Sequence, residues 1–369
     1  MSCFLSAFGM VTSVGHTADT ACAAIRAGIS RPRELASFTV LDELGAGTPL
    51  FGHPVHGFSE GFRAIGRWTR LAAGALSDLM GRVRSDLTHD PSFWTRALIY
   101  AAIPEPDERF LSREPMDPDH LSELYTIPVL RHAGVPVHAE AVQLVRSRDV
   151  GFIDCLAQAV GQIAVGRAPH AIIFAVDSLL EPHCLSRLSA TGRLKTADQP
   201  TGLAPGEAGV AVMLSARGNR ARPGATCVLE SAVVGKEDEF DAERNSSGGA
   251  ALSAVIKAAV ERSSAGLPLQ GDWISTLNGE VGPASELGST EQRLGAGVLA
   301  AESRLLHPFT EVGDTGTAAP AIACAMAAHG FRRGYARGDR TLISARADDG
   351  SVGAAVIGKI APVGGAAHD

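Results

Sequence analysis

The sequence predicts an α/β fold in which two similar halves share a central layer of helices. The first observation behind this prediction is the segment 318–330, which consists almost wholly of small and apolar residues and indicates a helix buried on all sides. The second is a repeated order of helix, strand, Gly-x-x-Gly and strand, at residues 166–212 and again at 337–356. Two halves that pack through their helices would place the apolar helix in the middle of the molecule.

Composition narrows the class of protein. The chain has 369 residues, 45% of them hydrophobic and 20% charged, with a formal net charge of −7. This balance is typical of a globular protein and argues against a nucleic-acid partner. No apolar run reaches about 18 residues, so no membrane span is expected. The six cysteines are scattered without a CxxC pair or zinc spacing, which predicts reduced thiols, a cytoplasmic location, and neither metal nor cofactor.

The first half alternates strands and helices. Continuous apolar runs such as 97–102 indicate buried strands, and apolar residues at a spacing of three to four indicate helices. The predicted strands cover residues 4–8, 38–41, 49–51, 97–102, 141–145, 171–176 and 209–214. The predicted helices cover residues 18–25, 65–79, 121–133 and 151–165. We expect a loop at 10–15 and a surface loop at 104–120, where proline and charge accumulate.

A stretch rich in Gly, Arg and Pro, residues 218–224, is the predicted junction between the halves. It divides the chain into an N-terminal half, 1–218, and a C-terminal half, 224–369. The expected C-terminal elements are strands at 227–234, 273–277, 341–347 and 350–356, and helices at 250–262, 290–299 and 318–330.

A glycine turn precedes the central helix. Gly313 and Gly316 permit backbone conformations that other residues resist, while Asp314 and Thr315 are suited to capping free N–H groups. We expect this turn to lie at the mouth of a cavity. Gly313, Thr315 and Gly316, with Gly279 after the strand at 273–277, are therefore the predicted ligand-binding residues.

Three segments resemble the β-ketoacyl synthase branch of the thiolase-like superfamily. They are residues 9–15 with the following helix to residue 30, the Pro-Gly-Glu-Ala-Gly stretch in 201–209, and 313–319, which is similar to the Gly-His-Thr-Glu-Ala-Ala-Gly motif. The resemblance implies a thiolase-like five-layered α-β-α-β-α fold made of two similar halves. It also implies an assembly that is usually a homodimer. Residues 30–140 match poorly, in the region that shapes the substrate tunnel and the dimer contacts.

The resemblance implies a cysteine nucleophile at a helix N-terminus and two histidines, and this sequence departs from all three. Asp149 or Val150 lies where the cysteine is expected, and Asn278 and Asp314 replace the histidines. An ionised Asp314 cannot donate to a thioester oxygen and would repel a malonyl carboxylate. Some condensing enzymes carry asparagine at one such position, although Asn278 before Gly279 also suits a turn. Decarboxylative condensation is therefore not expected.

Other reactive residues have simpler explanations. Cys155 lies one to two turns inside its helix, so we interpret it as a core thiol, with a nucleophile as the alternative. Residues 19–22, Asp-Thr-Ala-Cys, copy the family's nucleophile tetrapeptide, but Cys22 falls on the apolar face of the first helix. His307 precedes a proline and is expected at the surface.

Two functions from different classes remain open. The first is a catalytically silent synthase-like accessory protein or partner subunit, in a homodimer or a heterodimer with a related subunit. Short thiolase-like proteins similar to this one are encoded with bacterial type VI secretion components, which implies a secretion effector as partner; an acyl carrier protein is the other. The alternative is an acyltransferase or thioesterase in which Glu280 and Asp314 form a carboxylate pair with one raised pKa. A third is a binder that performs no chemistry.

Overall fold

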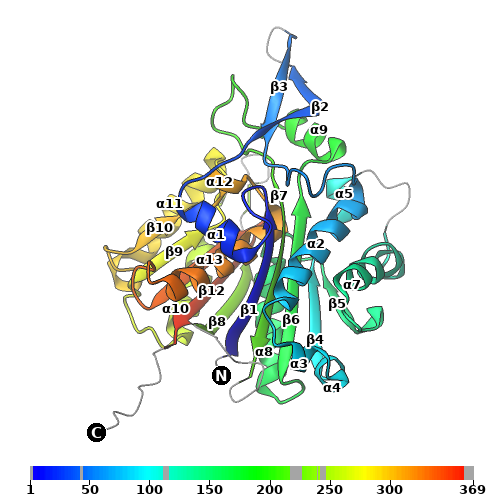
Figure 1. Cartoon of the computed structure of the whole chain (residues 1–369). Coiled ribbons are helices and arrows are strands. Elements are labelled where there is room, and N and C mark those ends of the chain that lie inside the picture. Colours follow the sequence, from blue (N-terminus) through cyan, green and yellow to red (C-terminus); the bar gives the residue numbers. More distant parts are fainter. Residues whose placement is uncertain are drawn as a thin grey trace.

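The computed structural model describes residues 3–41, 45–110, 116–216, 227–238, 240–241 and 247–360. A ten-stranded sheet runs through the molecule in the order β10-β9-β11-β12-β8-β1-β7-β6-β4-β5. A separate hairpin, β2 (Arg33–Leu41) and β3 (Gly47–Gly52), projects from the body of the molecule (Figure 1).

The large sheet repeats one half-pattern twice. In the N-terminal half, β1, β7 and β6 are antiparallel neighbours, and β6, β4 and β5 are parallel. In the C-terminal half, β8, β12, β11, β9 and β10 follow the same order and directions. The N-terminal strands are β1 (Cys3–Thr12), β4 (Ala97–Ala102), β5 (Val142–Val145), β6 (His170–Ser178) and β7 (Glu207–Ser215). Their counterparts are β8 (Cys227–Lys236), β9 (Gly271–Ser275), β10 (Arg304–Leu306), β11 (Arg340–Arg346) and β12 (Ser351–Lys359). The predicted internal repeat is confirmed.

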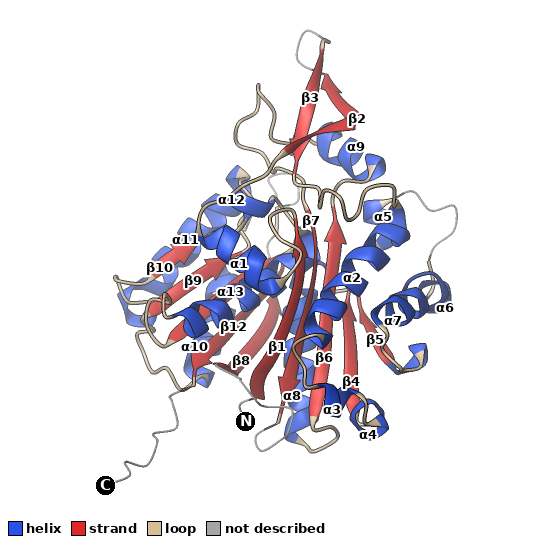
Figure 2. Cartoon of the chain, in the orientation of Figure 1, coloured by secondary structure: helices blue, strands red, loops and turns tan. Residues whose placement is uncertain are grey.

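Helices lie between the two halves of this sheet and on the outer face of each half, which gives five layers in the order α-β-α-β-α (Figure 2). The central pair, α8 (Gly151–Ala164) and α13 (Ala319–Arg333), contacts strands of both halves. On the outer faces, α2 (Ala64–Met80) packs on the N-terminal strands with α7 (Ile127–Ala133) beside it, and α10 (Ala250–Arg262) packs on the C-terminal strands with α11 (Val281–Val298) beside it. The predicted layering is correct because 318–330 is buried as expected, with Ala321 to Cys324 fully inaccessible. The predicted junction, 218–224, lies outside the described residues.

Several predicted elements need correction. The loop expected at 10–15 starts later, because β1 continues to Thr12. The surface loop expected at 104–120 contains α5 (Pro106–Arg109), whose arginine is largely covered. α11 begins nine residues before the predicted start, in a glycine-containing stretch that masks its helical character. Several helices were not predicted, among them α9 (Pro182–Ala190) and α12 (Phe309–Val312), and neither was strand β10.

The remaining short elements connect these layers. They are α1 (Ala18–Arg26), α3 (Ser85–Thr88), α4 (Pro91–Thr95), α6 (Pro118–Leu121), η1 (Ser122–Thr126), η2 (Ala139–Ala141), η3 (Arg148–Val150) and η4 (Gly316–Ala318). In the described part of the chain, no helix combines the length and apolarity that crossing a bilayer requires.

Candidate functional site

A cavity of about 930 Å³ lies between the halves, where the segments that lead into α8 and α13 face each other. Its walls come from α5, η3, α9 and the loop after it, the start of α11, and the turns at residues 314–316 and 348. Its lining is strongly charged, with four arginines and five carboxylates. An acyl tunnel would need apolar walls, so the charge decides against a purely apolar ligand.

Asp149 occupies the position where the resemblance places the nucleophile. It lies in η3, directly before α8, and η3 begins at Arg148 with a φ of +49°, a strained value for a side-chain-bearing residue. Burial raises the pKa of the Asp149 carboxyl well above its ordinary value; Arg109, 3.8 Å away, opposes the rise, and the charge of Asp314 adds to it. A carboxyl in this state is a weak nucleophile and can act as a proton donor.

Asn278 lies between the carboxylates of Glu280 and Asp314. Its Nδ2 donates to Glu280 Oε2 at 2.8 Å and to Asp314 Oδ2 at 2.9 Å. Glu280 is also held by Arg193, with both oxygens 2.7 Å from guanidinium nitrogens. Burial raises the pKa of Asp314, and hydrogen bonds from Gly316 and Asn278 oppose the rise. The amide of Asn278 thus bridges Glu280 and Asp314, the predicted carboxylate pair, and the charge of Glu280 adds to the rise in the pKa of Asp314.

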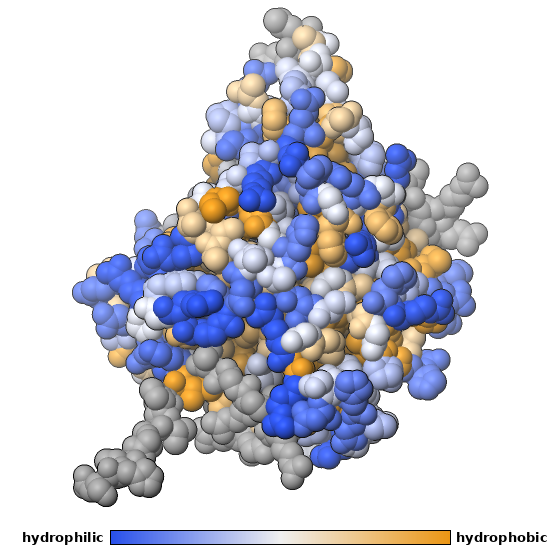
Figure 3. All heavy atoms as spheres, in the orientation of Figure 1, coloured by the Kyte–Doolittle hydropathy of each residue, from blue (hydrophilic) through white to orange (hydrophobic). Residues whose placement is uncertain are grey.

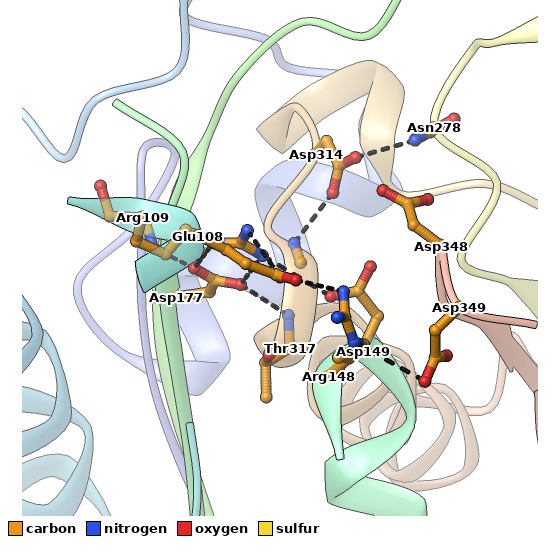
Figure 4. A network of polar contacts seen from close by, with 12 residues as sticks. Glu108, Arg109, Arg148, Asp149, Asp177, Asn278, Asp314, Thr317, Asp348 and Asp349 are labelled. Carbon is orange, nitrogen blue, oxygen red and sulfur yellow. Dashed lines mark hydrogen bonds and ion pairs between the residues drawn. The ribbon is translucent and has the colours of Figure 1, made fainter. Parts of the chain in front are cut away.

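The most enclosed ion pair at the site was not predicted from the sequence. Arg109 donates from Nε and Nη2 to the two oxygens of Asp177, at 2.7 and 2.8 Å (Figure 4). Asp177, fully buried at the end of β6, also accepts from the N–H groups of Ser178 at 2.7 Å and Thr317 at 3.0 Å. A Cβ added to Gly316, whose φ is +49°, would lie 2.1 Å from Asp177 Oδ2. The turn before α13 therefore needs glycine because it rests on this carboxylate.

Further ion pairs at the cavity connect the N-terminal half to the C-terminal half. Arg193 Nη1 lies 2.7 Å from Asp348 Oδ2, in the loop between β11 and β12. Arg148 pairs with Glu108 and lies 3.6 Å from Asp349 (Figure 4). The structure thus brings Asp149, Asn278 and Asp314 to one place, inside a network of arginine–carboxylate contacts that join the N-terminal to the C-terminal half.

Of the four predicted ligand-binding residues, Gly316 lines the large cavity. Gly313 and Thr315 line only a void of about 10 Å³, and Thr315 is buried. Gly313 and Gly279 have positive φ values of +71° and +95° and lie against backbone carbonyls of the 202–204 segment. These two glycines therefore fix the path of the chain around the cavity.

The Pro-Gly-Glu-Ala-Gly stretch also has a structural explanation. Glu207 is fully buried and accepts from Arg67 Nη1 at 3.0 Å, Ser178 Oγ at 3.0 Å and the Val55 N–H at 2.8 Å. Gly206 pairs with Asp314 through its N–H at 2.9 Å. The motif ties α2 and β6 to the turn before α13.

None of the six cysteines is an accessible thiol, because all are buried. Burial raises the pKa of Cys155 well above its ordinary value, and raises that of Cys22 to about 12. Cys184 in α9, which no sequence pattern singled out, lines the large cavity, and burial raises its pKa to about 11. His307 is half-buried instead of exposed, because Phe309 of α12 and the backbone of Ser275 lie against its ring; burial lowers its pKa. Within the described residues, no group of three or more His, Cys, Asp or Glu could hold a metal ion.

A comparison with protein-family models gave no match, and a search of curated proteins also gave none. Solved structures match over nearly the whole chain. A chain from a type II polyketide synthase complex, an acyl-carrier protein with its hexaketide-bound ketosynthase, has a TM-score of 0.75 at 13% identity and covers 97% of this chain and 99% of its own. The ishigamide ketosynthase/chain length factor has a TM-score of 0.68 at 18% identity, covering 98% and 100%.

A ketosynthase in complex with its chain length factor, from Xenorhabdus doucetiae, has a TM-score of 0.70 at 13% identity and covers 97% and 98%. At such identities the likeness establishes the fold. The protein has the thiolase-like fold of ketosynthases and chain length factors, as the sequence predicted.

Proposed function

We propose that this protein is a catalytically silent ketosynthase-like subunit that acts by binding partners. One observation carries the proposal. The three positions where the chemistry would reside hold Asp149, Asn278 and Asp314, and these side chains are committed to a network of arginines and carboxylates. A thiolate is needed for acyl transfer by the ketosynthase route, and every thiol of the chain is buried.

A related subunit is the partner that we favour. Two of the similar structures are ketosynthases with chain length factors, and a third contains an acyl-carrier protein. The region 30–140 supports this proposal, because it holds half of the large apolar side chains that are exposed among the described residues. These are Leu41, Phe51, Phe62, Leu124 and Ile127. Figure 3 shows hydrophobic residues on the projecting hairpin among hydrophilic ones. A contiguous patch of such groups would mark a protein interface.

A second form of the proposal makes the protein an accessory protein, or adaptor, whose partner is a bacterial type VI secretion effector. It rests on the resemblance alone. Both forms predict a protein that assembles and leaves thioesters intact, so the partner that co-purifies with the protein from its own cells distinguishes them.

The test is intact-mass spectrometry after incubation with a panel of acyl-CoA and acyl-carrier thioesters, with an active ketosynthase as positive control. We expect no covalent adduct and no loss of thioester. An adduct mapped to one residue would overturn the proposal. Co-expression with a ketosynthase, followed by size-exclusion chromatography, then tests the heterodimer; two separate peaks would exclude that partner.

An acyltransferase or thioesterase is the second candidate. It is favoured by two carboxyls with raised pKa values, Asp149 and Asp314, beside a cavity of about 930 Å³. A protonated carboxyl could serve as a general acid there. Turnover of any thioester that is lost in Asp149→Asn or Asp314→Asn and kept in Cys155→Ala would establish this function.

A further inference from the structure

A second cavity, of about 290 Å³, lies away from the charged one and shares none of its lining residues. It is enclosed by α1, β9, β10 with the loop after that strand, and α13. In Figure 1, α1 and α13 lie side by side on the face turned toward the viewer. Neither the proposed function nor its chemistry involves this cavity, so a ligand bound there would be independent of that function.

The walls of this second cavity are mostly apolar. Ile25, Ile274, Leu306, Met326 and Ala327 line it, and Leu306 and Met326 are only half covered by other residues. Half-covered apolar side chains in a concave site favour an apolar ligand. At roughly 30 Å³ per water molecule in the liquid, the volume corresponds to about ten waters, enough for a small molecule of about ten heavy atoms.

The cavity is lined by two arginines, Arg26 and Arg304, and by two carboxylates, Asp272 and Glu311. Arg304 is neutralised by Asp272, 2.8 Å away, and Asp272 accepts a second hydrogen bond from the Arg337 N–H at 3.1 Å. Arg26, at the end of α1, has no carboxylate within ion-pair distance among the described residues. Its guanidinium lies 5.1 Å from the ring centroid of Tyr335, which also lines the cavity. Glu311, the second lining carboxylate, is not within ion-pair distance of Arg26, and burial raises its pKa.

We infer that this cavity binds a medium-chain aliphatic monocarboxylate, with the chain against Ile274, Leu306 and Met326 and the carboxylate on Arg26. The guanidinium offers a forked pair of donors that matches a carboxylate, and the ring of Tyr335 holds it in place. A neutral alcohol of the same length loses the charge-assisted contact, and an amine meets an unfavourable charge.

Isothermal titration calorimetry with octanoate, octanol and octylamine tests this inference on the full-length protein. For a ligand of about ten heavy atoms, a dissociation constant of about 1 mM is expected for octanoate, and at least tenfold weaker binding for the other two. Arg26→Gln should weaken octanoate about tenfold, and Arg26→Glu should abolish octanoate binding. Met326→Trp should fill the cavity and remove binding. The matched control is Arg187→Gln at the charged cavity, which should leave the affinity unchanged.

Arg26 is exposed, so its variants should fold even if Met326→Trp does not. Equal binding of octanoate and octylamine would overturn the inference, as would unchanged octanoate affinity in Arg26→Gln and Arg26→Glu. No saturable octanoate binding at about 10 mM would overturn it too.

Discussion

Replacing Asp177 with asparagine tests how much the buried ion pair with Arg109 stabilises the fold. The change keeps the size of the side chain and an oxygen that accepts from the Ser178 N–H, but it removes the charge that faces Arg109. The arginine side chain is 12% exposed and would remain charged without its closest partner. Removing one partner of a buried pair costs about 3–5 kcal/mol.

That cost becomes a shift in melting temperature through the unfolding entropy. At about 2.1 cal/mol/K per residue, a chain of 369 residues has an unfolding entropy of about 0.8 kcal/mol/K. We therefore expect Asp177→Asn to lower Tm by about 4–6 °C in differential scanning calorimetry. The double variant Arg109→Met/Asp177→Asn should lose less, because no unpaired charge then stays buried.

The matched control is the exposed pair Arg84–Asp86, in which Arg84→Gln should leave Tm unchanged. A Tm shift below about 1 °C for Asp177→Asn would refute the reasoning. A double variant whose loss equals the sum of the two single losses would refute it as well, since it would mean that the pair does not act as a unit.

Three further predictions concern the same region. Gly316→Ala should lower Tm by about 4 °C, since its Cβ would meet Asp177, whereas Gly334→Ala, with a similar positive φ and open space around it, should cost about 1–2 °C; equal losses would contradict the crowding. Burial raises the pKa of Asp149 in the folded protein. The protonated carboxyl therefore contributes stability that is fully present below the unfolded-state pKa of about 3.9 and is lost as the pH rises through the folded-state pKa. Asp149→Asn should therefore raise Tm at pH 7 by about 1–2 °C with no gain at pH 3, and a gain at both pH values would argue against this linkage. Native protein should react with a thiol reagent such as DTNB far more slowly than urea-unfolded protein, which should expose all six thiols; rapid native labelling would contradict the buried thiols, Cys155 included.

The layered fold could be predicted because its signals are local. The apolar composition of the run 97–102 and of the helix at 318–330 is enough to predict that both are buried. Strand β4 matches its predicted bounds residue for residue. Helix α9 was missed because its buried face consists of only Cys184, Leu185 and Leu188, too few to show a periodicity. A short amphipathic helix is defined by what it packs on, which a local pattern does not contain.

The site could be predicted only where a motif pointed to it. Asp149, Asn278 and Asp314 were selected by resemblance, and the fold gathers them. Arg109 lies 68 residues from Asp177 in a proline-rich charged stretch, so nothing local distinguishes it from a solvated arginine. A weak signal was present, because Asp177 directly follows a buried apolar strand, and a carboxylate at such a position needs a cation or several N–H donors.

The seam between the halves of the sheet has a mechanical consequence. Among the described residues, strand β1 meets β8 through Cys3–Leu5 and Cys227–Leu229 alone, while it pairs with β7 along most of its length. A force that pulls the halves apart would therefore break very few sheet hydrogen bonds before it loaded the central helices. The stiffness of the molecule against such opening comes from the packing of α8 against α13 and from the arginine–carboxylate contacts beside them. The sheet is continuous at this seam, but few hydrogen bonds between its strands hold the two halves together there.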